Sequence, residues 1–136
     1  MEQANKTRKY LIATHGTFSA GVKSSLGMII GNTEHLFIIQ AYTDQNIAIE
    51  DEIKHVLEQI SEDDELIIFS DILGGSVTNQ LLQQATKSNI HIISGFNLPL
   101  LIDVMLGNAG TPIDEIINNA IINAKEQVVY VNKLIN

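Results

Sequence analysis

The chain contains no cysteine and few basic residues: 8 Lys or Arg stand against 16 Asp or Glu among 136 residues. The absence of cysteine excludes disulfides, thiolate metal sites and cysteine nucleophiles. The net charge of −8 argues against nucleic-acid binding, because phosphate contacts need clustered Lys and Arg. An acidic surface can steer a basic protein partner, but we favour the simpler interpretation that the acidity keeps the protein in solution.

Long apolar runs are also lacking. No stretch approaches the roughly 18 to 20 continuous apolar residues of a membrane span. The first ten residues, MEQANKTRKY, lack the apolar core of a signal peptide. We therefore expect a cytoplasmic protein. At 136 residues, of which 45% are hydrophobic, the sequence predicts one domain over 1–136, with residues 1–7 as a loose tail.

Short apolar runs rich in isoleucine alternate with segments of helical periodicity. The runs do not alternate strictly between apolar and polar residues, which favours parallel strands covered on both faces. A short buried helix is predicted over 98–106, and an amphipathic helix from 113 to 124. The predicted strands are Tyr10–Thr14, Leu36–Tyr42, Leu66–Ser70, Ile90–Ser94 and a last, β-branched strand over 128–135.

The order βαβαβαβααβ predicts an α/β fold with an open, doubly wound and mainly parallel sheet. Ligands of such sheets bind beyond the carboxyl ends of the strands, where the strand order reverses. With the order 2-1-3-4, this reversal lies between strands 1 and 3. His15 follows the first strand and Asp71 follows the third, so we expect the two side chains to face each other across one crevice.

His15 and Asp71 each have a purely structural interpretation. A histidine in a turn can bond the local backbone, and an Asp after a strand often caps the following turn. Their shared position favours a functional pair instead. The other histidines, at 35, 55 and 91, do not follow the carboxyl end of any predicted strand, and we interpret them as structural or solvated.

Gly74, Gly75 and Ser76 open the third helical segment. Two glycines and a capping serine leave unpaired backbone N–H groups at the start of a helix. Such N–H groups favour the binding of an anion. The segment is not a Walker A loop, because the Gly-Lys-Ser/Thr ending is missing. The signal is weak by itself and stronger when combined with His15 and Asp71.

These residues favour nucleophilic chemistry at an imidazole. One ring nitrogen can attack when the other carries the proton, and a carboxylate that accepts this N–H fixes the tautomer and stabilises the cation that forms. Three catalytic metal ligands are hard to assemble here, and neither a metal nor another cofactor is expected. The simplest group for such a histidine to accept is a phosphoryl group, whose transfer depends on positioning and charge stabilisation.

Three motifs resemble one family. ATHG at 13–16, SDILGGSVTN at 70–79 and ISGFNLPLL at 93–101 are similar to motifs of the enzyme IIA component of the mannose/fructose/sorbose-type bacterial phosphoenolpyruvate-dependent sugar phosphotransferase system (PTS), the mannose-type EIIA. The resemblance covers about residues 8–136. It departs from the family pattern at Ala13, Val77 and Thr78, which flank the site, and we expect these departures to affect the choice of partner.

The resemblance implies a role for each matching residue. His15 would carry the phosphoryl group, Asp71 would orient its ring and stabilise the phosphohistidine, and Ser76 with the turn at Gly74 and Gly75 would contact the phosphoryl group. The histidine phosphocarrier HPr would be the donor. A separate IIB protein would be the acceptor and would serve membrane subunits IIC and IID. The resemblance also implies a homodimer in which the last strand is exchanged between subunits and runs antiparallel at the sheet edge.

Three alternatives remain open. The phosphoryl-carrier subunit of dihydroxyacetone kinase has a similar fold and histidine but typically lacks the segment matching residues 71–76. A phosphoaspartate receiver would use Asp71, but it needs an acidic pair after strand 1, where this chain has Thr14 and His15. A regulatory domain would be phosphorylated on His15 without onward transfer to any IIB.

Overall fold

The structure is a computed structural model that describes residues 6–44 and 46–135. The chain divides into two compact units, the first ending at Phe96 and the second beginning at Asn97. The first unit holds every residue of the predicted crevice. A single domain over 1–136 stays a prediction.

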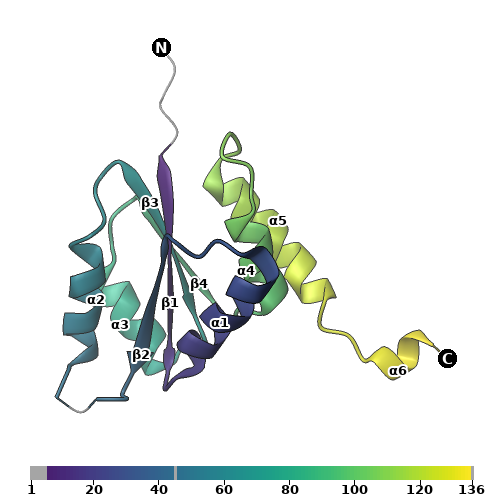
Figure 1. Cartoon of the computed structure of the whole chain (residues 1–136), viewed down its shortest axis with the longest axis horizontal. Helices are drawn as coiled ribbons and strands as arrows, with labels where there is room; N and C mark the ends of the chain where they lie inside the picture. Colours follow the sequence, from purple (N-terminus) through teal and green to yellow (C-terminus); the bar gives the residue numbers. More distant parts are fainter. Residues whose placement is uncertain (1–5, 45, 136) are drawn as a thin grey trace. The chain divides into compact units, whose positions relative to one another are not determined.

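Four parallel strands form the sheet of the first unit, in the order β2-β1-β3-β4. This confirms the predicted strand order. All four carboxyl ends lie at one edge of the sheet, as the arrowheads in Figure 1 show. The strands are β1 (Thr7–His15), β2 (Leu36–Ala41), β3 (Asp64–Ser70) and β4 (Ile90–Ser94).

Strand β1 begins three residues before the predicted start at Tyr10. Its first residues are polar, which hides them from a search for apolar runs, but they pair in register with β3, Thr7 opposite Asp64. Lys9 Nζ lies 2.9 Å from Asp64 Oδ2, so an ion pair supports the start of both strands. Of the predicted tail, residues 1–5 lie outside the described residues, and Thr7 already belongs to the strand.

Three helices cover the sheet of the first unit: α1 (Phe18–Ile30), α2 (Ile49–Leu57) and α3 (Ser76–Gln84). Helices α2 and α3 lie on one side of the sheet and α1 on the other (Figure 1). The apolar cluster beneath α2 and α3 includes Leu11, Ile53, Ile68, Val77 and Leu81, all fully buried. Because both faces are covered, the strands are apolar on both sides, as the continuous runs of the sequence predict.

The second unit consists of helices α4 (Leu98–Met105), α5 (Ile113–Glu126) and α6 (Val131–Leu134). Asn97 begins α4, because its side-chain oxygen accepts a hydrogen bond from the Leu100 N–H at 3.0 Å. The same side chain donates to the Ala124 carbonyl at 3.0 Å and so joins the start of α4 to the end of α5. Within the described residues, no helix is both long and apolar enough to pass through a membrane.

The predicted strand over 128–135 is wrong for the single chain. Residues 128–130 belong to no helix or strand, and Val131–Leu134 form the short helix α6. A strand needs a neighbour to take up its backbone hydrogen bonds, whereas a helical turn bonds to itself, as the Lys133 N–H does to the Tyr130 carbonyl at 3.0 Å. The antiparallel edge strand is therefore absent from the part of the chain described here.

Candidate functional site

The site is built at the carboxyl ends of β1 and β3. His15 is the last residue of β1, and Asp71 directly follows β3. The chain turns away from β1 at Gly16, whose φ of +61° lies in the left-handed region that glycine enters without strain. The Gly16 N–H donates to the Ala41 carbonyl of β2 at 2.9 Å, which fixes the backbone beside His15.

His15 and Asp71 lie next to each other, as the sequence predicts, and are joined by hydrogen bonds. Asp71 Oδ2 accepts one hydrogen bond from the His15 backbone N–H at 2.9 Å and lies 2.8 Å from the ring nitrogen Nδ1. The two side chains differ in exposure: that of Asp71 is 11% exposed and that of His15 is 41% exposed. The carboxylate is thus largely buried, while part of the imidazole is exposed to solvent.

The charge of Asp71 fixes the tautomer of His15. Burial raises the pKa of the Asp71 carboxyl. The hydrogen bonds from the His15 backbone and ring and the charge of His15 lower it by more, so the pKa of Asp71 lies below its usual value. An ionised carboxylate can only accept a hydrogen bond, so Nδ1 carries the proton. The lone pair of Nε2 is then free to act as a nucleophile.

Ser76 lies on the nucleophilic side of the imidazole. Its Oγ is 3.4 Å from His15 Nε2, a distance at the long end for a hydrogen bond. The structure corrects its predicted role as a capping serine: the N-cap of α3 is Gly75, and Ser76 is the first helical residue. Since the side chain does not cap the helix, it is available to the crevice.

The two glycines form a tight turn beside the ring. Gly74 has a φ of +78°, which favours glycine. A Cβ on Gly75 would lie 3.2 Å from the Ile72 carbonyl oxygen and 3.6 Å from His15 Cε1. The Gly75 N–H donates to the Ile72 carbonyl at 3.2 Å, so this amide closes the turn. It is therefore not one of the free N–H groups that the glycines led us to expect.

Sequence reasoning missed Tyr42, which directly follows β2. Its hydroxyl donates to Ser76 Oγ at 2.8 Å, and its ring centroid lies 5.7 Å from that of His15 at an interplanar angle of 45°. Its position in the sequence could have identified it as a site residue, because Tyr42 follows a strand that ends at the same edge of the sheet as β1 and β3. The predicted β2 included Tyr42 as a strand residue, whereas the strand ends at Ala41.

A buried pair of hydroxyls supports the loop after β3. Ser70 Oγ and Thr78 Oγ1 lie 2.7 Å apart, and Thr78 Oγ1 also donates to the Ile72 carbonyl at 2.7 Å. Both residues are almost fully buried. They tie the end of β3 to the first turn of α3 and so hold the segment that carries Asp71.

The three departures from the family motifs are buried as well. Ala13 and Val77 are 0% exposed and Thr78 is 2% exposed. Side chains at such positions cannot contact a partner protein in this conformation. We expected these departures to affect partner choice, and the structure limits any such effect to one transmitted through packing.

The other histidines lie outside the crevice. His91 Nε2 is 3.7 Å from Glu65 Oε2, while His35 and His55 are exposed. No group of three or more His, Asp or Glu side chains within 6–44 and 46–135 could hold a metal ion. Thr14, at the position where a receiver needs acidic residues, is buried and accepts a hydrogen bond from the Ser19 N–H at 2.9 Å.

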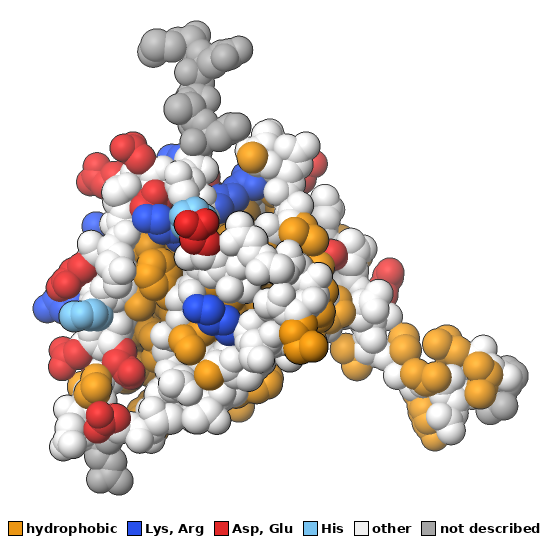
Figure 2. Space-filling view, in the orientation of Figure 1, with side chains coloured by type: hydrophobic (Ala, Val, Ile, Leu, Met, Phe, Trp, Pro, Cys, Tyr) orange, Lys and Arg blue, Asp and Glu red, His pale blue; other side chains and the backbone are white. Residues whose placement is uncertain are grey.

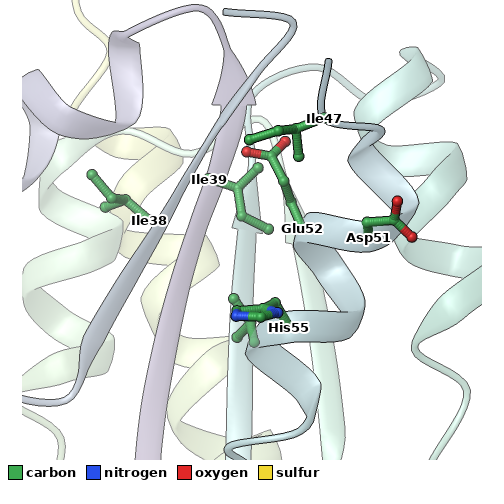
Figure 3. Close-up of a pocket in the computed structure, with 7 residues that line it drawn as sticks. Ile38, Ile39, Ile47, Asp51, Glu52 and His55 are labelled. Atoms are coloured by element: carbon green, nitrogen blue, oxygen red, sulfur yellow. The ribbon is translucent and has the colours of Figure 1, made fainter. Parts of the chain in front are cut away.

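A cavity of 360 Å³ lies between β2 and α2, away from the histidine pair. Figure 3 shows Ile39 of β2 opposite Glu52 and His55 of α2. Burial, together with the nearby charge of Asp44, raises the pKa of Glu52. The cavity is lined by Ile38, Ile39, Ile47, Asp51, Glu52, His55 and Val56. None of the predicted site residues lines it, so the chemistry is assigned to the strand ends.

Comparison with known proteins agrees with the motifs. The model of the family described as PTS system fructose IIA component (EIIA-man) matches residues 9–121. The PTS system fructose-specific EIIA component of Bacillus subtilis (strain 168) is 27% identical over 111 residues, which cover 80% of this chain and 76% of the relative.

Two solved structures are similar over almost the whole chain. A protein of Klebsiella pneumoniae subsp. pneumoniae MGH 78578, assigned to the phosphoenolpyruvate-dependent sugar phosphotransferase system, is 30% identical with a TM-score of 0.92, covering 100% of this chain and 99% of that one. The PTS IIA protein associated with the fucose utilization operon of Streptococcus pneumoniae is 24% identical with a TM-score of 0.79, covering 98% and 100%. At that identity the second likeness concerns the fold alone.

Proposed function

The chain belongs to the family of PTS system fructose IIA components, and from this premise we propose that it is a phosphocarrier whose acceptor atom is His15 Nε2. The observation that carries the proposal is the bond between His15 Nδ1 and the Asp71 carboxylate. This bond leaves Nε2 as a free nucleophile at the mouth of the crevice. HPr is the proposed donor and a IIB protein the proposed acceptor.

The reaction needs two in-line displacements at phosphorus. The lone pair of Nε2 attacks the phosphoryl group of phospho-HPr, the donor's P–N bond breaks, and its electron pair returns to the donor imidazole. The proton on Nδ1 stays in place, so the phosphorylated ring is cationic and the Asp71 carboxylate stabilises it. In the second displacement a nucleophile of IIB attacks the same phosphorus, and the electron pair of the P–N bond returns to Nε2.

Hydrogen-bond donors that could bind the phosphoryl group lie beside Nε2. Ser76 Oγ lies next to this nitrogen, and α3 begins at Ser76. The first N–H groups of a helix have no acceptor within the helix and favour an anion. We assign Ser76 and the turn at Gly74 and Gly75 to phosphoryl binding, with the Ser76 hydroxyl and the start of α3 as the donors.

The surroundings of the crevice suit a protein partner. Ile72 and Leu73, the two residues after Asp71, are 58% and 80% exposed, and Phe18 at the start of α1 is 54% exposed. Contiguous exposed apolar patches mark protein contact sites, and we propose that these residues contribute to one. HPr and IIB would bind in turn over these residues, and the chain would serve IIC and IID only through IIB. This role places the protein in the cytoplasm.

We also propose a homodimer held by the last residues of the chain. Six apolar side chains after α5 are between 48% and 81% exposed: Val128, Val129, Tyr130, Val131, Leu134 and Ile135. Figure 2 shows hydrophobic side chains gathered over this segment. Exchange of a terminal segment between two copies is a low-cost route to a dimer, and the partner's sheet edge would supply the hydrogen bonds that an isolated strand lacks.

The experiment that tests the carrier function is phosphorylation in vitro. The protein is mixed with phosphoenolpyruvate, enzyme I and HPr, and the phosphate is located by mass spectrometry under mildly basic conditions. We expect one phosphate, on His15, and none in His15→Ala. The matched control is His55→Ala, an exposed histidine outside the crevice. Phosphate that persists in His15→Ala contradicts the assignment.

Onward transfer separates the carrier from a regulatory domain. Purified phosphoprotein is mixed with a IIB protein from the same genome, and the phosphate is followed from one chain to the other. A carrier loses its phosphate to IIB within the mixing time, whereas a regulatory domain keeps it. Stability also separates a histidine from an aspartate acceptor, because phosphohistidine survives base and breaks down in acid.

A further inference from the structure

Tyr42 has an unusual backbone conformation for its side chain. Among the residues that the structure describes, it is the one non-glycine residue with a positive φ, at +66°. The left-handed region is sterically unfavourable for an L-residue with a Cβ. Such strain persists where the surroundings enforce it, and it concentrates at functional sites. At Tyr42 the conformation turns the chain at the end of β2, beside His15.

Two interactions of the Tyr42 side chain lie at the site. Its ring lies against the His15 imidazole, and its hydroxyl donates to Ser76 Oγ at 2.8 Å. The residue is still 55% exposed, so burial does not explain its placement. The contacts join residues from three separate segments: the ends of β1 and β2 and the start of α3.

The directions of the hydrogen bonds follow from the charge of Asp71. In the neutral imidazole that donates from Nδ1 to the carboxylate, Nε2 has no proton and can only accept. The Tyr42 hydroxyl donates to Ser76 Oγ, so the hydroxyl proton of Ser76 is available to a different acceptor. His15 Nε2, at 3.4 Å from Ser76 Oγ, can accept this proton. The chain of donors therefore runs from Tyr42 through Ser76 to the nucleophile.

We propose that Tyr42 is a positioning residue for phosphoryl transfer and acts on His15 through Ser76. In the free protein, Tyr42 orients the Ser76 proton toward Nε2. After transfer, the same proton points to an oxygen of the phosphoryl group on Nε2. This proposal deepens the proposed carrier function and rests on it for the second step. The arrangement also places the Tyr42 ring beside the imidazole, with 5.7 Å between the two ring centroids.

The first test uses the unphosphorylated protein and does not depend on any donor. Tyr42→Phe removes one oxygen and keeps the ring. In nitrogen-15 spectra of the histidine side chains, we expect the Nε2 signal of His15 to shift in Tyr42→Phe and in Ser76→Ala, in the same direction. Tyr10→Phe is the matched control, because Tyr10 lies in β1 five positions before His15 and contributes nothing to the site. An unshifted Nε2 signal in Tyr42→Phe overturns the proposal.

The second test measures the rate of phosphorylation by phospho-HPr. Loss of the hydrogen bond that orients the Ser76 hydroxyl predicts a rate about tenfold lower in Tyr42→Phe. Since Tyr42 acts through Ser76, the double variant Tyr42→Phe/Ser76→Ala should be no slower than Ser76→Ala. Multiplicative losses would mean that Tyr42 acts independently of Ser76 and would overturn the proposal. Wild-type protein that accepts no phosphate overturns the carrier function, and the spectra then test Tyr42 alone.

Discussion

A single oxygen atom, Asp71 Oδ2, receives both the backbone N–H and the ring Nδ1 of His15, at 2.9 Å and 2.8 Å. The two residues are 56 positions apart in the chain. The double contact fixes the backbone and the ring plane of His15 together, so the imidazole has one orientation with Nε2 outward. A carboxylate at this position therefore orients the nucleophile and stabilises the cation that transfer would create on it.

Asp71→Asn should slow phosphorylation by phospho-HPr while the fold is kept. The amide has no charge to stabilise the cation, and it can donate to Nδ1 and so favour the wrong tautomer. The corresponding change in the Ser-His-Asp protease triad costs about 10⁴-fold, which gives the scale for the expected loss of rate. Rates are measured by quenched mixing and gel separation.

Asp103→Asn is the control for Asp71→Asn, because Asp103 is exposed on α4 and the change of net charge is the same. Circular dichroism verifies the fold of both variants. If Asp71→Asn is phosphorylated as fast as wild type, Asp71 only shapes the turn after β3.

Thr78→Val should destabilise the loop that carries Asp71. The change keeps the volume of the side chain but removes the hydroxyl, which leaves Ser70 Oγ buried and without its partner at 2.7 Å. We expect the free energy of unfolding to fall by about 1 to 2 kcal/mol, measured by urea denaturation. Thr86→Val, at an exposed position after α3, should change it by less than about 0.5 kcal/mol. Equal effects at the two positions would contradict a supporting role for the hydroxyl pair.

Asp64 should make the stability depend on pH in the acid range. The Ser61 backbone N–H and the Lys9 side chain, each 2.9 Å from Asp64 Oδ2, hold the pKa of Asp64 below its usual value. The stabilisation is therefore complete above the unfolded pKa of about 3.9 and is lost as the pH falls through the lower, folded pKa.

Asp64→Asn tests this pH dependence by urea denaturation at pH 7 and pH 3. At pH 7 we expect the variant to be less stable than wild type by about 1 to 2 kcal/mol, and the difference should shrink at pH 3. Asp63→Asn, the exposed neighbour, should show neither effect. A difference that stays constant between the two pH values would exclude the ionised Asp64 as its source.

Deletion of residues 128–136 should convert a dimer to a monomer. We expect light scattering at micromolar concentration to give twice the chain mass for wild type and the single mass after deletion, because the deletion removes the exposed apolar side chains of the last segment. Val129→Lys should weaken the dimer, whereas Leu82→Lys, which changes an exposed apolar residue of α3, should not. A wild-type monomer, or a dimer that survives the deletion, would exclude exchange of this segment.

The sequence determined the architecture of the first unit and the placement of the histidine pair. Its apolar runs and helical faces are local patterns, and the rules for parallel crossovers leave few ways to connect them. The observed order β2-β1-β3-β4 is one of these. The positions of His15 and Asp71 follow from it in turn, because residues at the carboxyl ends of neighbouring parallel strands must lie at the same edge.

Only the tertiary structure decided the rest of the site. Tyr42 reaches Ser76 across 34 positions, and no local pattern encodes that contact, because it depends on a strained backbone and on the exact packing of two loops. The Gly75 N–H donates to the Ile72 carbonyl for a similar reason, because the conformation of the loop determines which acceptor this N–H reaches. Residues 128–135 show the same limit, since their composition suits a strand but a strand forms only where another strand offers its hydrogen bonds.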